Sequence, residues 1–419
     1  MPQIPLSIVG CGGMGHRHLF ALAELQRAGL SPFELVAACD PVTDNANSLA
    51  DEAASLLGKR PAVVANYDEL SALGVAAVDI TTTPRFHHTL AVDALARGWH
   101  AMVEKPVGLT VRACNQIRAA AQDSGLVVSV AENYRRDPVN RLAKALLDAG
   151  AIGAPRFMIH QTGGGADRMT ISVWRHQKDQ SGVLLDVGVH YADMMEYFLG
   201  EITSVYAQMR LHEPIRYNPA GEGKEPTSNP AGVYGKWQRQ MPARFEATAD
   251  DAIYGTLNFA SGAVCQYIED HAMHGQGMWT RQIHGSKGSF DLPNDRSGVP
   301  IRMTAGGETV DDGRLLDLVP DFRLDEATAT LFGGDRLWRY DFPFNETDRK
   351  LIAVEYADFG DAIAGKHPAE VDIEQGSRSV AVSYALMESG QSGQIVNVAD
   401  VLAEKIGDYQ ASINTSLGI

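Results

Sequence analysis

The stretch Leu6-Ser-Ile-Val-Gly-Cys-Gly-Gly-Met-Gly15 decides the fold of this chain. Residues 6–10 form a short apolar run typical of a β-strand, and a G-x-G-x-x-G pattern then opens a helix-like segment. Glycines at this spacing allow a tight turn, a close approach of the backbone to a pyrophosphate, and close packing of helix on strand. The helix N-terminus adds free N–H groups for phosphate oxygens. The stretch therefore predicts a dinucleotide-binding turn.

The cofactor that this turn predicts is NAD. Asp40 ends the next strand-like run, 25 residues beyond Gly15. A carboxylate there accepts hydrogen bonds from both ribose hydroxyls and repels a 2′-phosphate, which favours NAD over NADP. The alternative is a glycine turn in an unrelated α/β protein, with Asp40 as a solvated strand end. The residues expected at the pyrophosphate are Gly10, Gly12, Gly13, Met14 and Gly15.

The first 130 residues alternate short apolar runs with helix-like segments, which is typical of parallel strands joined by right-handed crossovers. We therefore predict a doubly wound Rossmann sheet over residues 1–130. The expected strands are 6–10, 33–40, 75–82, 100–103 and 126–131, and the expected helices are 14–29, 44–58, 87–98 and 110–124.

The sequence changes in character after residue 150, where extended segments follow one another and helices become rare. We expect strands at 205–210, 252–259, 263–269 and 281–284, a long polar loop at 213–245, and late helices at 351–363 and 375–389. Residues 131–419 are therefore predicted to form a second domain on a mostly antiparallel sheet.

Charge and apolar content exclude several classes of function. The chain of 419 residues has 36 basic and 52 acidic residues, a net charge of −16, which argues against nucleic acid or an anionic membrane as the main partner. No apolar run approaches the ~20 residues that span a bilayer, and the N-terminus shows no signal-peptide pattern. Four cysteines without a C-x-x-C pair are expected to be free thiols in the cytoplasm.

Three further motifs follow in order. They are Thr82-Thr83-Pro84-Arg85-Phe86-His87, then Glu104-Lys105-Pro106, and then Gly182-Val-Leu-Leu-Asp186-Val-Gly-Val-His190. With the opening glycine turn, and with Ile283-His-Gly-Ser-Lys-Gly-Ser-Phe290, the chain resembles the Gfo/Idh/MocA family of oxidoreductases. The resemblance implies a Rossmann domain followed by an α/β domain with a large open sheet, and it implies homo-oligomers built on that sheet.

The resemblance also implies the catalytic group Lys105, Asp186 and His190. Alcohol oxidation needs a base for the hydroxyl proton, and histidine titrates near neutral pH. Lys105 would form a hydrogen bond to the reacting oxygen. Asp186 would orient His190 or hold a neighbouring hydroxyl. Asp186 lies four residues before His190, so the two side chains share one face if both lie on one helix. Taken singly, each residue has a structural alternative: a surface lysine, a core histidine, or a helix-surface carboxylate.

Supporting positions are carried over in the same way. The cofactor would also contact Thr82, Thr83, His87, Glu104, Lys105 and Asn133. The substrate would meet Lys105, Asp186 and His190, together with Arg168, Trp174 and Arg175. The structural alternatives are that Trp174 is a core side chain, that Arg175 is a surface side chain, and that residues 163–168, which include Arg168, form a plain surface loop. His271-x-x-His274 lacks a third ligand, so we expect no metal.

These observations predict an NAD-dependent dehydrogenase acting on a secondary hydroxyl of a sugar, a polyol such as inositol, or a glycoside. One alternative is an NAD-dependent glycoside hydrolase, which oxidises a ring carbon transiently, eliminates the aglycone, adds water and reduces the carbon again. Another is a non-catalytic NAD-sensing regulator, which the intact Lys105, Asp186 and His190 argue against. We expect a small carbohydrate or polyol as partner and a homo-oligomer.

Overall fold

Among six short strands near the N-terminus, those at residues 77–80 and 128–131 are buried along their whole length, as helices covering both sides of a parallel sheet require. The computed structural model describes residues 3–419 and divides them into two units. Unit 1 holds the residues up to Asn133, with Pro230–Tyr234 and Asn345–Ser377. Unit 2 holds Tyr134–Asn229, Gly235–Phe344 and Arg378–Ile419. The boundary expected at residues 130/131 stays a prediction; the present division changes unit after Asn133 and also groups two later segments with unit 1.

The sheet of unit 1 is parallel throughout and has the strand order β3-β2-β1-β4-β5-β6. This is the doubly wound order, in which the direction of winding reverses between β1 and β4. Its strands are β1 (Ile4–Val9), β2 (Phe33–Cys39), β3 (Ala62–Val64), β4 (Ala77–Ile80), β5 (His100–Glu104) and β6 (Val128–Ala131). The predicted Rossmann sheet is confirmed.

The helices of unit 1 follow the strands as expected. They are α1 (Gly13–Arg27), α2 (Thr43–Leu57), α3 (His87–Ala96), α4 (Val111–Ser124) and most of α10 (Phe344–Ile363), with 3₁₀ turns η1 (Tyr67–Leu73), η2 (Pro84–Phe86) and η5 (Pro230–Gly232). Strand β3 and the three 3₁₀ turns were not expected, because segments of three to seven residues carry too little periodicity.

Unit 2 is built on a nine-stranded sheet in the order β16-β15-β14-β13-β7-β12-β11-β8-β17. Only β7 and β12 pair in parallel, so the predicted mostly antiparallel sheet is confirmed. The strands are β7 (Pro155–Gly165), β8 (Ile202–Arg210), β11 (Ala252–Phe259), β12 (Val264–Met273), β13 (Met278–Gly285), β14 (Gly288–Leu292), β15 (Arg302–Ala305), β16 (Glu308–Val310) and β17 (Val396–Asn397).

The remaining elements of unit 2 connect or cover this sheet. They are the pair β9 (Ile215–Tyr217) and β10 (Arg244–Glu246), the helices α5 (Pro138–Asp148), α6 (Val183–Asp186), α7 (Gly188–Leu199), α8 (Gly235–Gln238), α9 (Glu326–Phe332), α11 (Ile373–Ser392), α12 (Val398–Leu402) and α13 (Ala411–Leu417), and the 3₁₀ turns η3 (Val173–His176), η4 (Pro219–Glu222) and η6 (Gly313–Leu318). Helices α6 to α9 correct the expectation that helices become rare after residue 150. The segment 213–245 is a long connection with short elements of its own.

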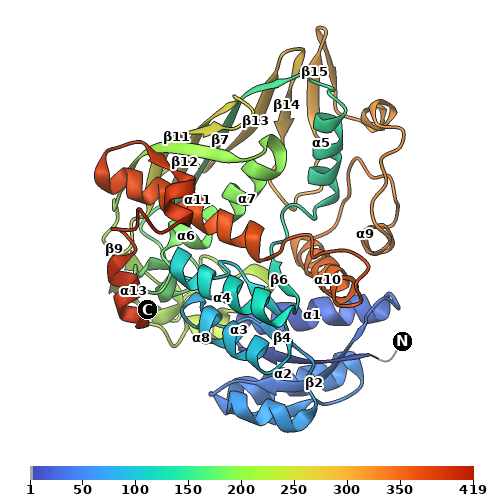
Figure 1. Cartoon of the computed structure of the whole chain (residues 1–419), viewed down its shortest axis with the longest axis vertical. Helices are drawn as coiled ribbons and strands as arrows, with labels where there is room; N and C mark the ends of the chain where they lie inside the picture. Colours follow the sequence, from blue (N-terminus) through green and yellow to red (C-terminus); the bar gives the residue numbers. More distant parts are fainter. Residues whose placement is uncertain (1–2) are drawn as a thin grey trace. The chain divides into compact units, whose positions relative to one another are not determined.

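One face of the large sheet is covered and the other is open. The C-terminal half of α11 packs closely on β8 and β11, since a Cβ at Gly390 would lie 2.6 Å from Met209 Cβ and one at Gly255 would lie 3.1 Å from Leu386 Cδ2 (Figure 1). Val205, Ala207 and Leu257 are buried on this covered face. Among residues 3–419, no helix is both long and apolar enough to cross a bilayer.

Candidate active site

The glycine-rich turn joins β1 to α1 at the switch point of the unit 1 sheet. Gly10 has a φ of +100°, and a Cβ there would lie 2.7 Å from the backbone nitrogen of Thr82. A Cβ at Gly15 would lie 2.4 Å from the carbonyl oxygen of Gly10. These two positions therefore require glycine, one for the turn and one for packing of α1 on β1.

The two central glycines differ in what surrounds them. A Cβ at Gly12 would meet nothing within 4 Å, so the turn is open on that side. A Cβ at Gly13 would lie 2.3 Å from the ring of Tyr234, whose hydroxyl also lies 3.4 Å from Nη1 of Arg17. The open side at Gly12, at the N-terminus of the 15-residue helix α1, leaves room for a pyrophosphate. Sequence reasoning missed Tyr234, which is more than 200 residues away.

Asp40 follows β2 and braces the same turn. Its Oδ2 accepts a hydrogen bond from the Cys11 backbone N–H at 2.8 Å, and its Oδ1 accepts one from that of Val42 at 2.8 Å. Each carboxylate oxygen keeps a second lone pair, so Asp40 can still accept ribose hydroxyls. Asp40, which was expected to favour NAD over NADP, therefore also stabilises the conformation of the glycine-rich turn.

The ends of β4 and β5 carry the next group of candidates. His87 is fully buried, with Nδ1 2.8 Å from the carbonyl oxygen of Pro106 and Nε2 3.2 Å from that of Thr82. Burial lowers the pKa of His87 below its usual value. The His87 ring thereby connects the Thr82–Thr83 segment to the Lys105–Pro106 segment. The sequence had predicted only that His87 contacts the cofactor.

A buried network of hydrogen-bonded ionisable groups is connected to the backbone of Lys105. Glu104 accepts a hydrogen bond from the Lys105 backbone N–H at 2.9 Å, and its other oxygen lies 3.2 Å from Nε2 of His18. Nδ1 of His18 lies 2.9 Å from Asp79, which also accepts a bond from the Tyr356 hydroxyl at 2.5 Å. Burial opposes a charge on His18, but the two carboxylates outweigh it and raise the pKa of His18 well above its usual value.

Asn133 provides a further test of whether the cofactor fits. Its side chain is buried just beyond β6, and its Oδ1 has no hydrogen-bond partner among the described residues. A buried polar atom without a partner is costly unless a ligand satisfies it. Together with the open side at Gly12, this atom shows that the residues of unit 1 fit NAD.

The candidates in unit 2 form two buried pairs. Nε of Arg175 donates to Oδ2 of Asp186 at 2.7 Å, and the Arg175 guanidinium lies 4.0 Å from the centre of the Trp174 ring. The ring of His190 stacks on Tyr134, with centroids 4.1 Å apart and an angle of 3° between the planes. The alternative of Arg175 as a surface arginine does not hold, because this side chain is buried.

Asp186 and His190 do not lie on one continuous helix. Asp186 is the last residue of α6, and His190 is in the first turn of α7, after a break at Val187. The condition under which these two residues would share one helical face is therefore not met. Asp193, further along α7, accepts a hydrogen bond from Nε of Arg135 at 2.8 Å.

The segment with Gly163, Gly164 and Gly165 is held in place, although its composition predicts a flexible loop. These glycines complete β7, and Arg168 forms a parallel bridge with Tyr217. Buried Arg216 donates through Nη1 to the carbonyl oxygens of Ala166 at 2.6 Å and Arg168 at 3.3 Å. The Arg168 side chain is exposed.

Histidine and cysteine side chains give no sign of a metal centre. No group of three His, Cys, Asp or Glu residues within 3–419 is arranged to hold a metal ion. His271 and His274 pair separately, with Glu269 at 2.7 Å and with Glu213 at 2.9 Å. All four cysteines are free and buried, which confirms that part of the prediction.

Comparison with known families identifies both parts of the chain. Residues 4–132 match the oxidoreductase family with an NAD-binding Rossmann fold, and residues 140–291 match the GFO/IDH/MocA C-terminal domain. A levoglucosan dehydrogenase of Pseudarthrobacter phenanthrenivorans is 29% identical over 71% of this chain and 75% of its own. The scyllo-inositol 2-dehydrogenase (NAD(+)) of Bacillus subtilis is also 29% identical, over 50% of this chain and 58% of its own.

Solved structures share the fold over almost the whole chain. An NAD binding oxidoreductase from Klebsiella pneumoniae covers 94% of this chain with 99% of its own, at a TM-score of 0.73 and 24% identity. A levoglucosan dehydrogenase in complex with NADH gives the same coverage, TM-score and identity. The expected fold class is confirmed, a Rossmann sheet followed by an α/β domain on a large sheet.

Proposed function

We propose, from the premise that the chain belongs to the Gfo/Idh/MocA family of NAD-binding oxidoreductases, that it oxidises a secondary ring hydroxyl of a sugar, polyol or glycoside. The observation that carries this proposal is the buried Arg175–Asp186 pair close in sequence to His190, in a chain whose Rossmann unit keeps the Glu104-Lys105-Pro106 motif. Relatives named for levoglucosan and scyllo-inositol support a cyclic polyhydroxy substrate.

The mechanism assigns one task to each residue. Gly10, Gly12, Gly13, Met14 and Gly15 hold the pyrophosphate of NAD, Asp40 holds its ribose, and Thr82, Thr83, His87, Glu104, Lys105 and Asn133 surround the rest of it. When bound there, NAD⁺ would supply the acceptor for the hydride of the carbinol carbon. His190 takes the hydroxyl proton, and the Lys105 ammonium bonds the reacting oxygen and stabilises the charge that develops on it.

Substrate binding falls to groups of unit 2. Arg175 holds Asp186 by a charge-assisted hydrogen bond, so the carboxylate is fixed in one orientation and can accept a bond from a neighbouring hydroxyl. Tyr134 stacks on His190 and restricts the imidazole to one plane. Trp174 offers an aromatic face for sugar C–H groups, and exposed Arg168 offers hydrogen-bond donors to a further hydroxyl or an acid.

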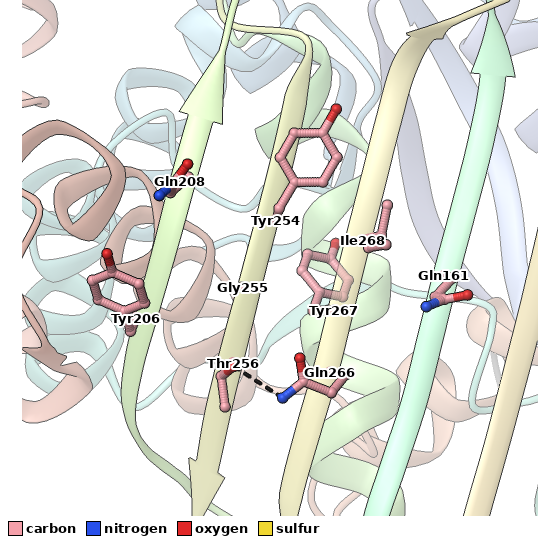
Figure 2. A pocket seen from close by; sticks show the side chains of 9 residues that line it. All are labelled: Gln161, Tyr206, Gln208, Tyr254, Gly255, Thr256, Gln266, Tyr267 and Ile268. Atoms are coloured by element: carbon pink, nitrogen blue, oxygen red, sulfur yellow. Dashed lines mark hydrogen bonds between the residues drawn. The ribbon is translucent and has the colours of Figure 1, made fainter.

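The open face of the unit 2 sheet supports assembly with a second copy of the chain. Figure 2 shows the side chains that line a hollow of about 320 Å³ on strands β7, β8, β11 and β12. Tyr206 pairs in register with Thr256, and Thr256 pairs with Gln266, which donates a hydrogen bond to it at 3.0 Å. Tyr206, Phe157 and Val264 are large exposed apolar groups on this face.

Four free buried cysteines further support a reducing cytoplasmic location.

The test is NADH formation by the purified protein with a panel of free sugars, inositols, anhydrosugars and glycosides, each mixture also being chromatographed. NADH with an oxidised, uncleaved product would support the dehydrogenase and name its substrate class. Cleavage that requires NAD without net NADH would replace it with a glycoside hydrolase. No turnover of any compound, with NAD bound, would contradict the proposal.

A further inference from the structure

Two residues of β12 form a carboxylate–histidine pair on the covered face of the large sheet. Nε2 of His271 lies 2.7 Å from Oε1 of Glu269, and the Tyr267 hydroxyl donates to Oε2 of Glu269 at 2.5 Å. The Glu269 side chain is 1% exposed, whereas the His271 side chain is 18% exposed. The carboxylate is thus fully engaged inside the protein, and the imidazole reaches towards solvent from it.

The carboxylate decides which ring nitrogen of His271 faces outwards as an acceptor. An ionised carboxylate only accepts hydrogen bonds, so Nε2 must carry the proton that it shares with Glu269. In the neutral ring, Nδ1 then presents a lone pair. Nδ1 makes no hydrogen bond to any residue between 3 and 419, and it is therefore open to a donor from a ligand.

The pair lies among the candidate substrate residues of unit 2. A Cβ at Gly188, which stands between Asp186 and His190, would lie 3.1 Å from Oε2 of Glu269. His176, which follows Arg175, interacts electrostatically with both His271 and Asp186. The imidazole of His271 therefore belongs to the same region as the proposed catalytic residues of this unit.

A second connection joins His271 to the segment that carries Arg168. Buried Arg216 donates to the carbonyl oxygen of His271 at 3.0 Å, as it does to those of Ala166 and Arg168. Its Nη2 is held by Asp251 at 2.7 Å. The arginine thus fixes the backbone of His271 and of the Arg168 turn in one rigid arrangement.

We propose that His271, oriented by Glu269, binds the substrate by accepting a hydrogen bond at Nδ1 from a hydroxyl next to the one that is oxidised. The inference rests on the proposed function and deepens it: the substrate carries at least two hydroxyls, one for the catalytic group and one for His271. An analogue that lacks the second hydroxyl leaves Nδ1 without a donor and binds more weakly.

Two substitutions at His271 separate this role from a purely structural one. His271→Gln keeps an amide N–H at the position of Nε2 for Glu269 but removes the acceptor at Nδ1. His271→Asn keeps an acceptor at the position of Nδ1 but gives up the bond to Glu269. We expect the sugar KM to rise about tenfold in His271→Gln and at most about threefold in His271→Asn, as loss of one neutral hydrogen bond predicts. His274→Gln, at the exposed pair with Glu213, is the matched control and should leave KM unchanged.

The Kd of NAD, measured by quenching of protein fluorescence, should stay the same in all three variants. The reverse order, with a normal KM in His271→Gln and a raised KM in His271→Asn, would overturn the inference and leave the dehydrogenase intact. A wild-type protein that turns over no polyol would overturn the proposed function and this inference with it. If His271→Gln does not fold, Glu269→Gln is used in its place. A glutamine amide beside Nε2 no longer requires the proton of His271 to sit on Nε2, so Nδ1 is no longer kept as the acceptor. An unchanged KM in Glu269→Gln would equally overturn the inference.

Discussion

Lys105 is the residue on which the proposed chemistry of unit 1 depends most. Its backbone N–H is held by Glu104, which His18 and Asp79 hold in turn, so the backbone at Lys105 is fixed from behind. We expect Lys105→Ala to lower kcat at least about 10³-fold, because the bond to the reacting oxygen is lost. The Kd of NAD should change little, since the glycine turn and Asp40 remain. Steady-state kinetics and a binding titration check the two expectations, and full activity of the variant would remove Lys105 from the mechanism.

His176 should make the protein sensitive to acid. Burial, followed by the charges of Arg216 and other neighbours, lowers the pKa of His176 from 6.5 to about 3, and its Nε2 accepts a hydrogen bond from the Thr170 N–H at 2.9 Å. The folded state therefore binds fewer protons than the unfolded state between these values. The stabilisation is complete above pH 6.5 and is lost as the pH falls towards 3, by up to about 1.4 kcal/mol per pH unit.

Replacement of His176 by glutamine isolates this contribution. The amide oxygen of His176→Gln can still accept the Thr170 N–H, but the side chain does not titrate. Urea unfolding at pH 7, 6 and 5 should show that the free energy of unfolding falls less steeply with acid in the variant than in the wild type. Equal slopes would contradict the assignment.

At the scale of elements, the Rossmann unit was predictable and the site in unit 2 was predictable only in part. Strands and helices of unit 1 carry clear periodicity, and the glycine turn has a local cause in Gly10 and Gly15. The break at Val187 has no such signal, because α6 and α7 together read as one apolar helical segment. Tyr234, His18 and Tyr134 were missed because their roles come from contacts between distant segments, which no local pattern encodes.

The segment Pro230–Tyr234 should strengthen NAD binding, because Tyr234 covers Gly13 in the glycine-rich turn. Tyr234→Ala removes the ring that holds this turn, and we expect the Kd of NAD to rise about tenfold, which corresponds to about 1.4 kcal/mol. Tyr234→Phe keeps the ring and loses long contacts of the hydroxyl, such as those with Nη1 of Arg17 and Sδ of Met14, both at 3.4 Å, so its Kd should change less than about threefold. Isothermal titration of both variants provides the measurement. Tyr206→Ala, on the open sheet face, is the control, and wild-type affinity in Tyr234→Ala would contradict the role.

At the scale of the whole molecule, the open face of the large sheet should determine assembly. Ile268 pairs with Tyr254, and Tyr254 pairs with Gln208, so these side chains form one row across β12, β11 and β8. If a second copy covers this row, Ile268→Arg places an unpaired charge in the contact, and in a two-fold symmetric contact the substitution occurs twice. Burying such a charge costs several kcal/mol, enough to dissociate an assembly of micromolar affinity.

Sedimentation velocity tests this expectation over a range of protein concentrations. Wild-type protein should sediment as a dimer or larger, and Ile268→Arg should sediment as a smaller species with an unchanged thermal unfolding midpoint, because the face lies outside the packed core. Val299→Arg, at an exposed position outside the strands of the sheet, should behave as the wild type. A monomeric wild type would show that this face has another role. A dimer that persists in Ile268→Arg would move the contact to another surface, while leaving the proposed chemistry of Lys105 and His190 unaffected.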